Sequence, residues 1–301
     1  MLRIGTRGSA LALAQAGTVA DAIGSARAEL VPIRTSGDEG GAGAAAGDDK
    51  SRFVREIERA LLDGEVGLAV HSAKDLPGEL PDGLGLVGVP AREDPADAWI
   101  GAGASLDDVA PGARVGTSSL RRRAQLLALR PDLEIVPLRG NVDSRLRRLR
   151  TDELDGIVLA AAGLERLGRA GEISFRLGLD EMTPAPGQGS LALEGRSGDA
   201  EAAEAAAKLT DREALVELTA ERAAVAQLGA SCDTPVGVCA RHEGDALVVR
   251  GWAGMPDGSE HVAERVEGDP GQPGALGETL VERMAARGVH ELLARAAEMA
   301  P

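Results

Sequence analysis

LAVHSAKDLP, residues Leu68 to Pro77, joins an apolar run to a polar ending. The apolar residues at its start predict a short buried strand, and Pro77 predicts that regular structure stops there. The strand would deliver His71, Lys74 and Asp75 to the carboxyl end of a sheet, where open α/β sheets bind ligands. The alternative is a solvated turn with Lys74 and Asp75 on the surface, and this stretch alone leaves it open.

The composition limits the classes of protein that this chain can represent. Its 301 residues are enough for two or three domains, and a hydrophobic content of 44% predicts an ordinary globular core. Aromatic residues make up only 1%, which argues against a protein that stacks nucleic-acid bases. A net charge of −15 likewise disfavours nucleic acid or an anionic membrane as a partner. Two cysteines, Cys232 and Cys239, are too few for a disulfide framework or a metal cluster.

The start of the chain has some features of a signal peptide, because Arg3 and Arg7 precede the Ala/Leu run from Ala10 to Ala14. That run is too short for a signal peptide, Gln15 interrupts it, and no cleavage site follows. No segment has the length that a bilayer span needs. We therefore expect a cytoplasmic protein.

The first motif is LRIGTRGS, residues 2–9, which predicts a strand ending in a glycine-punctuated loop with Arg7 and Ser9. A helix is expected from Ala10 to Ala26, because this segment is rich in Ala and Leu. Ser9 and the first backbone N–H groups would then lie at the positive end of a helix dipole, a position suited to an anion. Many α/β proteins begin in this way, so the motif is weak by itself.

An arginine-rich segment lies between residues 114 and 150, where ten arginines accompany three acidic residues. Its charge is +7, whereas the remainder of the chain carries −22. Two turns in it, 116–119 and 138–141, each follow a predicted strand and precede a predicted helix, which favours anion binding. Arginine offers two parallel donors to a carboxylate, so arginines at strand ends suit a small ligand with several carboxylates. We expect ligand contacts from Arg121, Arg122, Arg139 and Arg145. The alternative, a solvated helix face, is expected for Arg123, Arg130, Arg147, Arg148 and Arg150.

Two Pro-containing segments, 91–98 and 184–189, predict crossovers between two strand–helix domains, a pattern that matches bilobal binding proteins. The expected strands include 30–34, 85–89, 155–160 and 190–194. Helices are expected at 53–62, 201–208 and 211–228, a further helix begins in 161–168, and the segment 275–300 is expected to be mostly helical. We predict an α/β fold with two periplasmic-binding-protein-like α/β domains, a cleft between them and a small α+β C-terminal domain. The predicted domains are 1–93 with 189–209, 94–188, and 210–301.

The two cysteines lie in different surroundings. Cys232 lies between Gly229 and Pro235, in a turn-forming context that favours an accessible thiol. Cys239 lies in the apolar run 236–240, where a cysteine behaves as a small buried hydrophobe. A buried hydrophobe is also the ordinary interpretation of any lone cysteine, and for Cys232 the residues alone do not exclude it.

The motif HSAKDLP at 71–77 resembles the signature of the porphobilinogen deaminase family, also called hydroxymethylbilane synthases. Further similarities extend the resemblance from Thr6 to Gly237, over most of the chain. They are Thr-Arg-x-Ser at 6–9, Arg-Glu-Asp-Pro-x-Asp-Ala at 92–98, Thr-Ser-Ser-Leu-Arg-Arg at 117–122, and Leu-Arg-Gly-Asn-Val-x-x-Arg-Leu at 138–146.

The resemblance implies a transferase of tetrapyrrole and heme biosynthesis. Four porphobilinogen molecules would be joined head to tail on a covalent dipyrromethane, with loss of ammonia at each step, and hydrolysis would release linear hydroxymethylbilane. Each pyrrole carries an acetate and a propionate, which gives the arginine-rich segment a physical reason. Each condensation would pass through an electron-poor azafulvene-like cation whose pyrrole N–H needs an anionic partner, and Asp75 suits that role as electrostatic stabiliser and as proton donor or acceptor.

The resemblance also implies roles for individual residues. Cys232 would carry the dipyrromethane cofactor through a thioether, which replaces the ordinary interpretation for this cysteine. Contacts with that cofactor are implied for Ser72, Lys74, Thr117, Ser119, Arg121, Arg122 and Arg166. Contacts with the substrate are implied for Arg7, Ser9, Gln15, Arg139, Arg145 and Gln188.

The chain departs from the family pattern in two places. Family members often have a Gly-Gly-Lys-Gly-Leu-Phe-type lid run, and residues 48–53 match it at Lys50 and Phe53 but not at the glycines. Many members have Gly-Gly-Cys, where this chain has Ala-Ser before Cys232.

The competing hypothesis is a non-catalytic two-lobed binding protein for a polycarboxylate anion. It would explain the arginines and the cleft, but it would give no role to Asp75 or Cys232. We expect the enzyme, with porphobilinogen as its small-molecule substrate, and we expect a monomer that binds no nucleic acid, membrane or metal.

Overall fold

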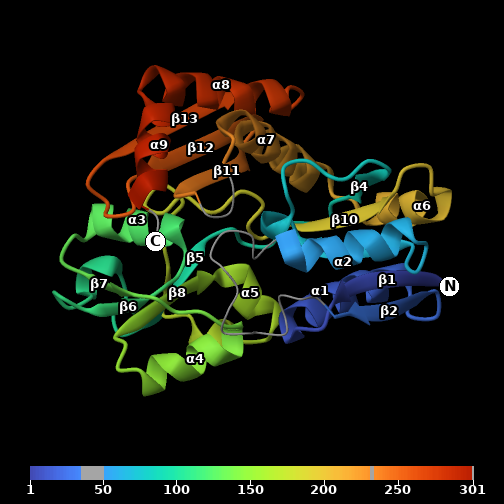
Figure 1. The fold of residues 1–301 in the computed structure, drawn as a ribbon, viewed down its shortest axis with the longest axis horizontal. Helices are drawn as coiled ribbons and strands as arrows, with labels where there is room; N and C mark the ends of the chain where they lie inside the picture. The colour runs from blue at the N-terminus through green and yellow to red at the C-terminus, as the bar shows by residue number, and fades with distance from the viewer. Residues whose placement is uncertain (35–50, 231–233, 300–301) are drawn as a thin grey trace. The chain divides into compact units, whose positions relative to one another are not determined.

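The computed structural model describes residues 1–34, 51–230 and 234–299, with side chains described again from Val54 after the first gap. These residues form two compact units. The first comprises 1–93 with 189–218, and the second comprises 94–188 with 219–301. Figure 1 shows the chain coloured from its N-terminus to its C-terminus. The division into three domains stays a prediction.

The first unit contains a five-stranded sheet in the order β2-β1-β3-β10-β4. Strand β1 is parallel to both β2 and β3, so the carboxyl ends of these three strands lie at one edge. Strand β10 is antiparallel to β3 and to β4. The bounds are β1 Leu2–Arg7, β2 Ala28–Ile33, β3 Leu68–Ser72, β4 Leu84–Gly88 and β10 Leu191–Arg196.

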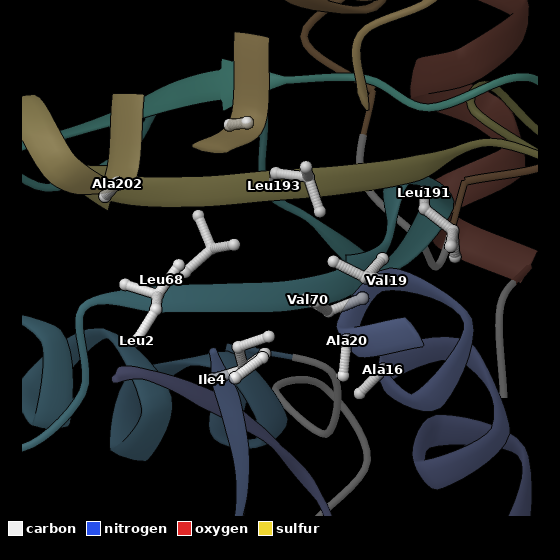
Figure 2. Packing of buried hydrophobic residues seen from close by; sticks show 12 residues of the cluster. Leu2, Ile4, Ala16, Val19, Ala20, Leu68, Val70, Leu191, Leu193 and Ala202 are labelled. Atoms are coloured by element: carbon white, nitrogen blue, oxygen red, sulfur yellow. The ribbon is translucent and has the colours of Figure 1, made fainter. Parts of the chain in front are cut away.

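Both faces of this sheet are buried, as the apolar start of β3 predicts. Leu68 and Val70 pack on the face that is covered by α1 and α6, in the cluster that Figure 2 shows. Ala69, between them, packs on the opposite face with residues of α2. The alternation follows from the period of two in a strand. The helices are α1 Ala10–Ile23, α2 Ser51–Leu62 and α6 Ala200–Leu209.

Helix α1 is shorter than the sequence led us to expect. It ends at Ile23 rather than at residue 26, so that boundary was wrong by three residues. Gly24 adopts a φ of 104° and its backbone N–H donates to the carbonyl oxygens of Ala20 and Asp21, which closes the helix. Glycine favours this conformation because it has no Cβ.

The second unit repeats the arrangement of the first sheet, with the strand order β7-β6-β8-β5-β9. Strand β6 is parallel to β7 and β8, whereas β5 is antiparallel to β8 and β9. In each sheet, the antiparallel strand beside the parallel set follows one of the two predicted crossovers. The strands are β5 Asp97–Gly101, β6 Arg114–Gly116, β7 Glu134–Val136, β8 Gly156–Ala160 and β9 Phe175–Arg176, and the helices are α3 Leu120–Leu129, α4 Val142–Thr151 and α5 Ala161–Arg166.

The C-terminal part of the second unit is an antiparallel sheet, β11-β12-β13. Helix α8 packs against β12 and β13, and α9 packs against β12. The bounds are β11 Val236–Glu243, β12 Ala246–Gly254, β13 His261–Gly268, α8 Pro273–Ala286 and α9 Val289–Met299, and α7 Arg212–Leu228 precedes them. Two α/β sheets and a small α+β part confirm the predicted fold class.

Candidate active site

The predicted catalytic residue lies in a turn that is firmly attached to the first sheet. Lys74 and Asp75 belong to the 3-10 turn Ala73–Asp75, directly after β3, and both are half-buried. Ala73 and Leu76 are buried in a hydrophobic cluster on either side of them. The backbone N–H of Ala73 also donates to the carbonyl oxygen of Ser190, at 3.0 Å. The turn therefore holds one ammonium and one carboxylate at the carboxyl end of β3, as the sequence predicts.

Beside that turn, the first unit contains a buried cluster of ionisable side chains. Nε2 of His71 lies 3.0 Å from Oε2 of Glu194 on the neighbouring strand β10. Glu58 of α2 is also buried, and burial followed by the negative charge of Glu194 raises the pKa of Glu58 above its usual value. Sequence reasoning gave these glutamates no role. The sequence held no signal for this contact, because His71 and Glu194 are 123 residues apart and meet only when β3 pairs with β10.

The N-terminal motif reaches the same edge of the first sheet. Arg7 ends β1, which is parallel to β3, so Arg7 and Ser72 both lie at strand ends on this edge. Ser9 caps α1 by accepting a hydrogen bond from the backbone N–H of Ala12, at 3.3 Å. Gln15 is buried on the first half of α1. The structure thus places Arg7, Ser9 and Ser72 on the edge that carries the turn with Lys74 and Asp75.

In the second unit, the predicted anion-binding residues follow the carboxyl ends of three adjacent parallel strands. Thr117 and Ser119 come after β6, Arg139 comes after β7, and Arg166 comes at the end of the helix that follows β8. Ser119 caps α3, because its Oγ accepts from the backbone N–H of Arg122. Arg139 is exposed and Arg166 is half-buried. Of these four residues, Arg139 lies nearest a strand end and Arg166 lies one helix beyond β8, and the binding roles predicted for them stay predictions.

Arg121 and Arg122 are buried and both bind Asp97, which sequence reasoning did not single out. Arg121 Nη1 lies 2.7 Å from Asp97 Oδ2, and Arg122 Nη2 lies 2.8 Å from Asp97 Oδ1. Burial opposes ionisation of this fully buried carboxyl, but the two guanidinium groups outweigh that effect and hold the pKa of Asp97 well below its usual range. Whether the two arginines also contact the cofactor stays a prediction.

Some arginines of the basic segment have structural partners that the sequence did not reveal. A solvated helix face was wrong for Arg123, whose Nε donates to the carbonyl oxygen of Pro256 at 3.1 Å. It was also wrong for Arg130, which donates to the carbonyl oxygens of Leu106 and Val109. All of these carbonyl groups are far in sequence from the arginine that they bind. The spacing of residues along a helix therefore could not indicate the contacts.

The other arginines of this segment lie nearer the surface. Arg145 is half-buried, and its Nε donates to the carbonyl oxygen of Gly140 at 2.8 Å, just before α4. Arg148 forms an ion pair with Asp152, four residues on, in which both side chains are more than a third exposed. Arg147 and Arg150 are exposed, in agreement with the solvated face predicted for them.

Three predicted residues cannot be placed. Lys50 and Cys232 fall outside the described residues, as does the side chain of Phe53. Cys239, in contrast, is fully buried in β11, which confirms its interpretation as core.

The second unit has the charge that a polycarboxylate cofactor would require. Arg121 and Arg122 share the carboxylate of Asp97, and the N-terminus of α3 adds a positive dipole end. Among 1–34, 51–230 and 234–299, no three His, Cys, Asp or Glu side chains are arranged to hold a metal ion. In the same ranges, no helix combines the length and apolar character of a bilayer span.

Comparisons with known proteins agree on one family. Residues 2–204 match the family model of the porphobilinogen deaminase dipyrromethane cofactor binding domain, and residues 215–286 match that of the porphobilinogen deaminase C-terminal domain. The chain is 46% identical to porphobilinogen deaminase of Thermus thermophilus over 298 residues, covering 97% of this chain and 98% of that one. It is 47% identical to that of Roseiflexus sp. over 301 residues, with the same coverage.

Solved structures add only a distant likeness. The L-cystine solute receptor of Neisseria gonorrhoeae aligns with a TM-score of 0.38 and 14% identity, over 69% of this chain and 84% of the receptor. The two family models, in contrast, together cover most of the sequence, from residue 2 to residue 286. The chain therefore belongs to the porphobilinogen deaminase family.

Proposed function

We propose that this protein is a hydroxymethylbilane synthase that joins four porphobilinogen molecules head to tail, releases one ammonia for each, and hydrolyses the product to linear hydroxymethylbilane. The observation that carries the proposal is the match of both family domains together with the HSAKDLP turn at the carboxyl end of β3. The dipyrromethane cofactor, when bound, provides the pyrrole end to which the first substrate is joined.

We assign the catalytic role to Asp75. As ammonia leaves porphobilinogen, positive charge develops on the pyrrole, and a carboxylate held nearby stabilises that charge. The same carboxylate can accept a hydrogen bond from the pyrrole N–H and can hold a proton during the step. The buried residues Ala73 and Leu76 fix the turn, so little reorganisation is needed when the charge appears.

The basic residues are assigned to the carboxylates of the cofactor and the growing chain. Lys74 and Ser72 would bind acetate and propionate groups at the edge of the first sheet. Arg139, Arg145 and Arg166 would do so at the edge of the second sheet, where each side chain is exposed or half-buried. Guanidinium groups suit this task because they bind a carboxylate through two parallel hydrogen bonds.

Cys232 is assigned as the covalent anchor of the cofactor. A thioether anchor must be reached by an activated pyrrole methylene, and the thiol must be free to attack it. Cys239 is fully buried in β11 and does not meet this requirement. Its burial and the Gly/Pro-flanked sequence around Cys232 support the assignment.

A monomer in the cytoplasm is also part of the proposal, with neither nucleic acid nor membrane as a partner. The net charge of −15 supports the absence of nucleic-acid and membrane partners, because a negatively charged protein is repelled by phosphate-rich surfaces. Light scattering coupled to size exclusion would measure the mass of the purified protein, and a mass of two chains or more would contradict the monomer.

The direct test incubates the purified protein with porphobilinogen and follows ammonia release together with bilane formation. The expected ratio is four ammonia molecules for each bilane that is detected as uroporphyrin after ring closure and oxidation. A non-catalytic binder would release no ammonia, and that result would reject the proposal. The match of both enzyme domains does not favour the binder.

A further inference from the structure

We propose that Asp97 is a positioning residue that holds three predicted ligand-binding side chains, Arg121, Arg122 and Gln188, in place for the cofactor. The proposal rests on the proposed function, because the ligand is the carboxylate-rich cofactor. It assigns a task to a residue that touches no reacting atom and acts through its neighbours.

Asp97 begins β5, and both of its oxygens are fully used inside the second unit. Its Oδ1 accepts from Arg122 Nε at 2.9 Å, from Arg122 Nη2 at 2.8 Å and from Gln188 Nε2 at 3.0 Å. Its Oδ2 accepts from Arg121 Nη1 at 2.7 Å. One carboxylate therefore fixes three side chains that come from two separate segments of the chain.

Each of these side chains also donates to a backbone carbonyl oxygen. Nη1 of Arg121, the atom that binds Asp97, donates to Thr183 O at 2.8 Å, and Nη1 of Arg122 donates to Val158 O at 3.1 Å. Gln188 Nε2 donates to Pro95 O at 2.7 Å. Asp97 lies in the first crossover segment, 91–98, and Gln188 in the second, 184–189, so the Asp97 carboxylate connects α3 with both segments.

Helix α3 has a second attachment to the same place. Gln125, one turn after Arg121, donates through Nε2 to Thr183 O at 2.9 Å and accepts through Oε1 from Thr183 N at 2.7 Å. The backbone around Thr183 is thus fixed by α3 independently of Asp97. Loss of the Asp97 carboxylate should therefore displace side chains without releasing the whole crossover segment.

The charges of Arg121, Arg122 and Asp97 favour a role in ligand binding in addition to stability, although a further buried carboxylate, that of Glu221, binds the backbone N–H of Gly187 beside Gln188. The Arg121, Arg122 and Asp97 side chains are 5%, 7% and 0% exposed, and together they leave one surplus positive charge. Keeping an unbalanced charge in the interior is costly, and a single arginine would already pair with this aspartate. The positive N-terminus of α3 adds to the cost. A bound carboxylate removes this imbalance, and the cofactor brings several.

A second buried ion pair provides the matched control. Arg92 and Glu217, in the first unit, lie 3.2 Å apart and are 2% and 4% exposed. This pair has one cation and one anion, and neither of its residues is among the predicted ligand contacts. Glu217→Gln should lower the unfolding temperature by breaking a buried ion pair, without affecting ligand binding.

The experiment measures, by intact mass, the fraction of purified protein that carries the two-pyrrole increment, beside the unfolding temperature of each variant. Asp97→Asn is expected to lower that fraction measurably below that of wild type, because charge-assisted contacts that hold the arginines are lost before the cofactor is attached. Glu217→Gln is expected to keep the wild-type fraction although its unfolding temperature falls. An unchanged fraction in folded Asp97→Asn, or an equal loss in both variants, would overturn the proposal.

A second variant covers the case in which Asp97→Asn fails to fold. Asp97→Glu keeps the negative charge but is one methylene longer, so the charge is balanced as before while the arginines must shift. We expect it to fold and to load less cofactor than wild type, and wild-type loading would contradict positioning by Asp97. If wild type carries the increment but releases no ammonia, the proposed reaction fails and the role of Asp97 stands. If wild type carries no increment, both fail.

Discussion

Asp75→Asn is the substitution that tests the proposed chemistry most sharply, because it exchanges a carboxylate for an amide of nearly the same shape. The turn that carries Asp75 is held by the buried residues Ala73 and Leu76 and by the hydrogen bond from Ala73 N to Ser190 O. None of these contacts uses the Asp75 side chain. The variant should therefore fold, and its cofactor should stay attached.

The expected loss of rate follows from the surroundings of the residue. Asp75 is half-buried, which corresponds to an effective dielectric constant of about 20 rather than that of bulk water. A unit positive charge that develops about 4 Å from the carboxylate is then stabilised by about 4 kcal/mol. An amide retains little of this, so kcat should fall by roughly three orders of magnitude.

The assay follows uroporphyrin absorbance after ring closure and oxidation of the bilane, at saturating porphobilinogen. Glu79→Gln is the matched control, since Glu79 is an exposed carboxylate four residues further on. It removes the same charge from the same part of the chain and should leave kcat within about twofold of wild type, as surface substitutions usually have small effects. If kcat of Asp75→Asn stayed within about threefold of wild type, the lost stabilisation would be far smaller than about 4 kcal/mol. That result would refute the electrostatic role of Asp75.

Two further predictions concern charge. Arg139→Leu and Arg145→Leu should impair chain assembly, because Arg139 follows the end of β7 and Arg145, in the first turns of α4, is held on the carbonyl oxygen of Gly140 in the same turn. Arg148→Leu should be nearly silent, because its partner Asp152 is a partly exposed carboxylate at the C-terminal end of α4. Gel analysis of the enzyme–pyrrole complexes would check this, and equal losses at all three positions would mean that helix-face charge had been mistaken for a ligand site. Glu58→Gln should make the unfolding temperature less dependent on pH. Burial and the charge of Glu194 raise the pKa of Glu58, so the folded protein binds this proton more tightly than the unfolded chain does. The stability from that proton is lost as pH rises from 4.5 through the raised pKa, and equal melting curves for variant and wild type over that range would contradict it.

The local features of the fold followed from the sequence. The apolar lead of β3 predicts its buried strand, and the basic turns predict the strand ends that carry Arg139 and Ser119. These strand ends could be predicted because a strand ends where its run of apolar residues ends, and that run can be read directly in the sequence. The end of α1 was missed, although Gly24 was a visible signal for a helix C-terminus.

The partners of charged side chains could not be predicted in the same way. Arg121 and Arg122 lie 24 and 25 residues after Asp97, and the contact exists only because β5 pairs with β8 beside α3. His71 meets Glu194 for the same kind of reason, through the pairing of β3 with β10. Neither periodicity nor spacing encodes such pairings, because they depend on the order of strands in the folded sheet.

The central claim is that this chain is a deaminase whose cofactor is attached to Cys232. Intact mass should exceed the sequence mass by two linked pyrrole units, and peptide mapping should place that increment on the peptide that contains Cys232. Cys232→Ser should lack the increment and should not colour with Ehrlich's aldehyde reagent, whereas Cys239→Ser should keep both, since Cys239 is buried in β11. An increment on Cys239, or one that survives in Cys232→Ser, would contradict the claim.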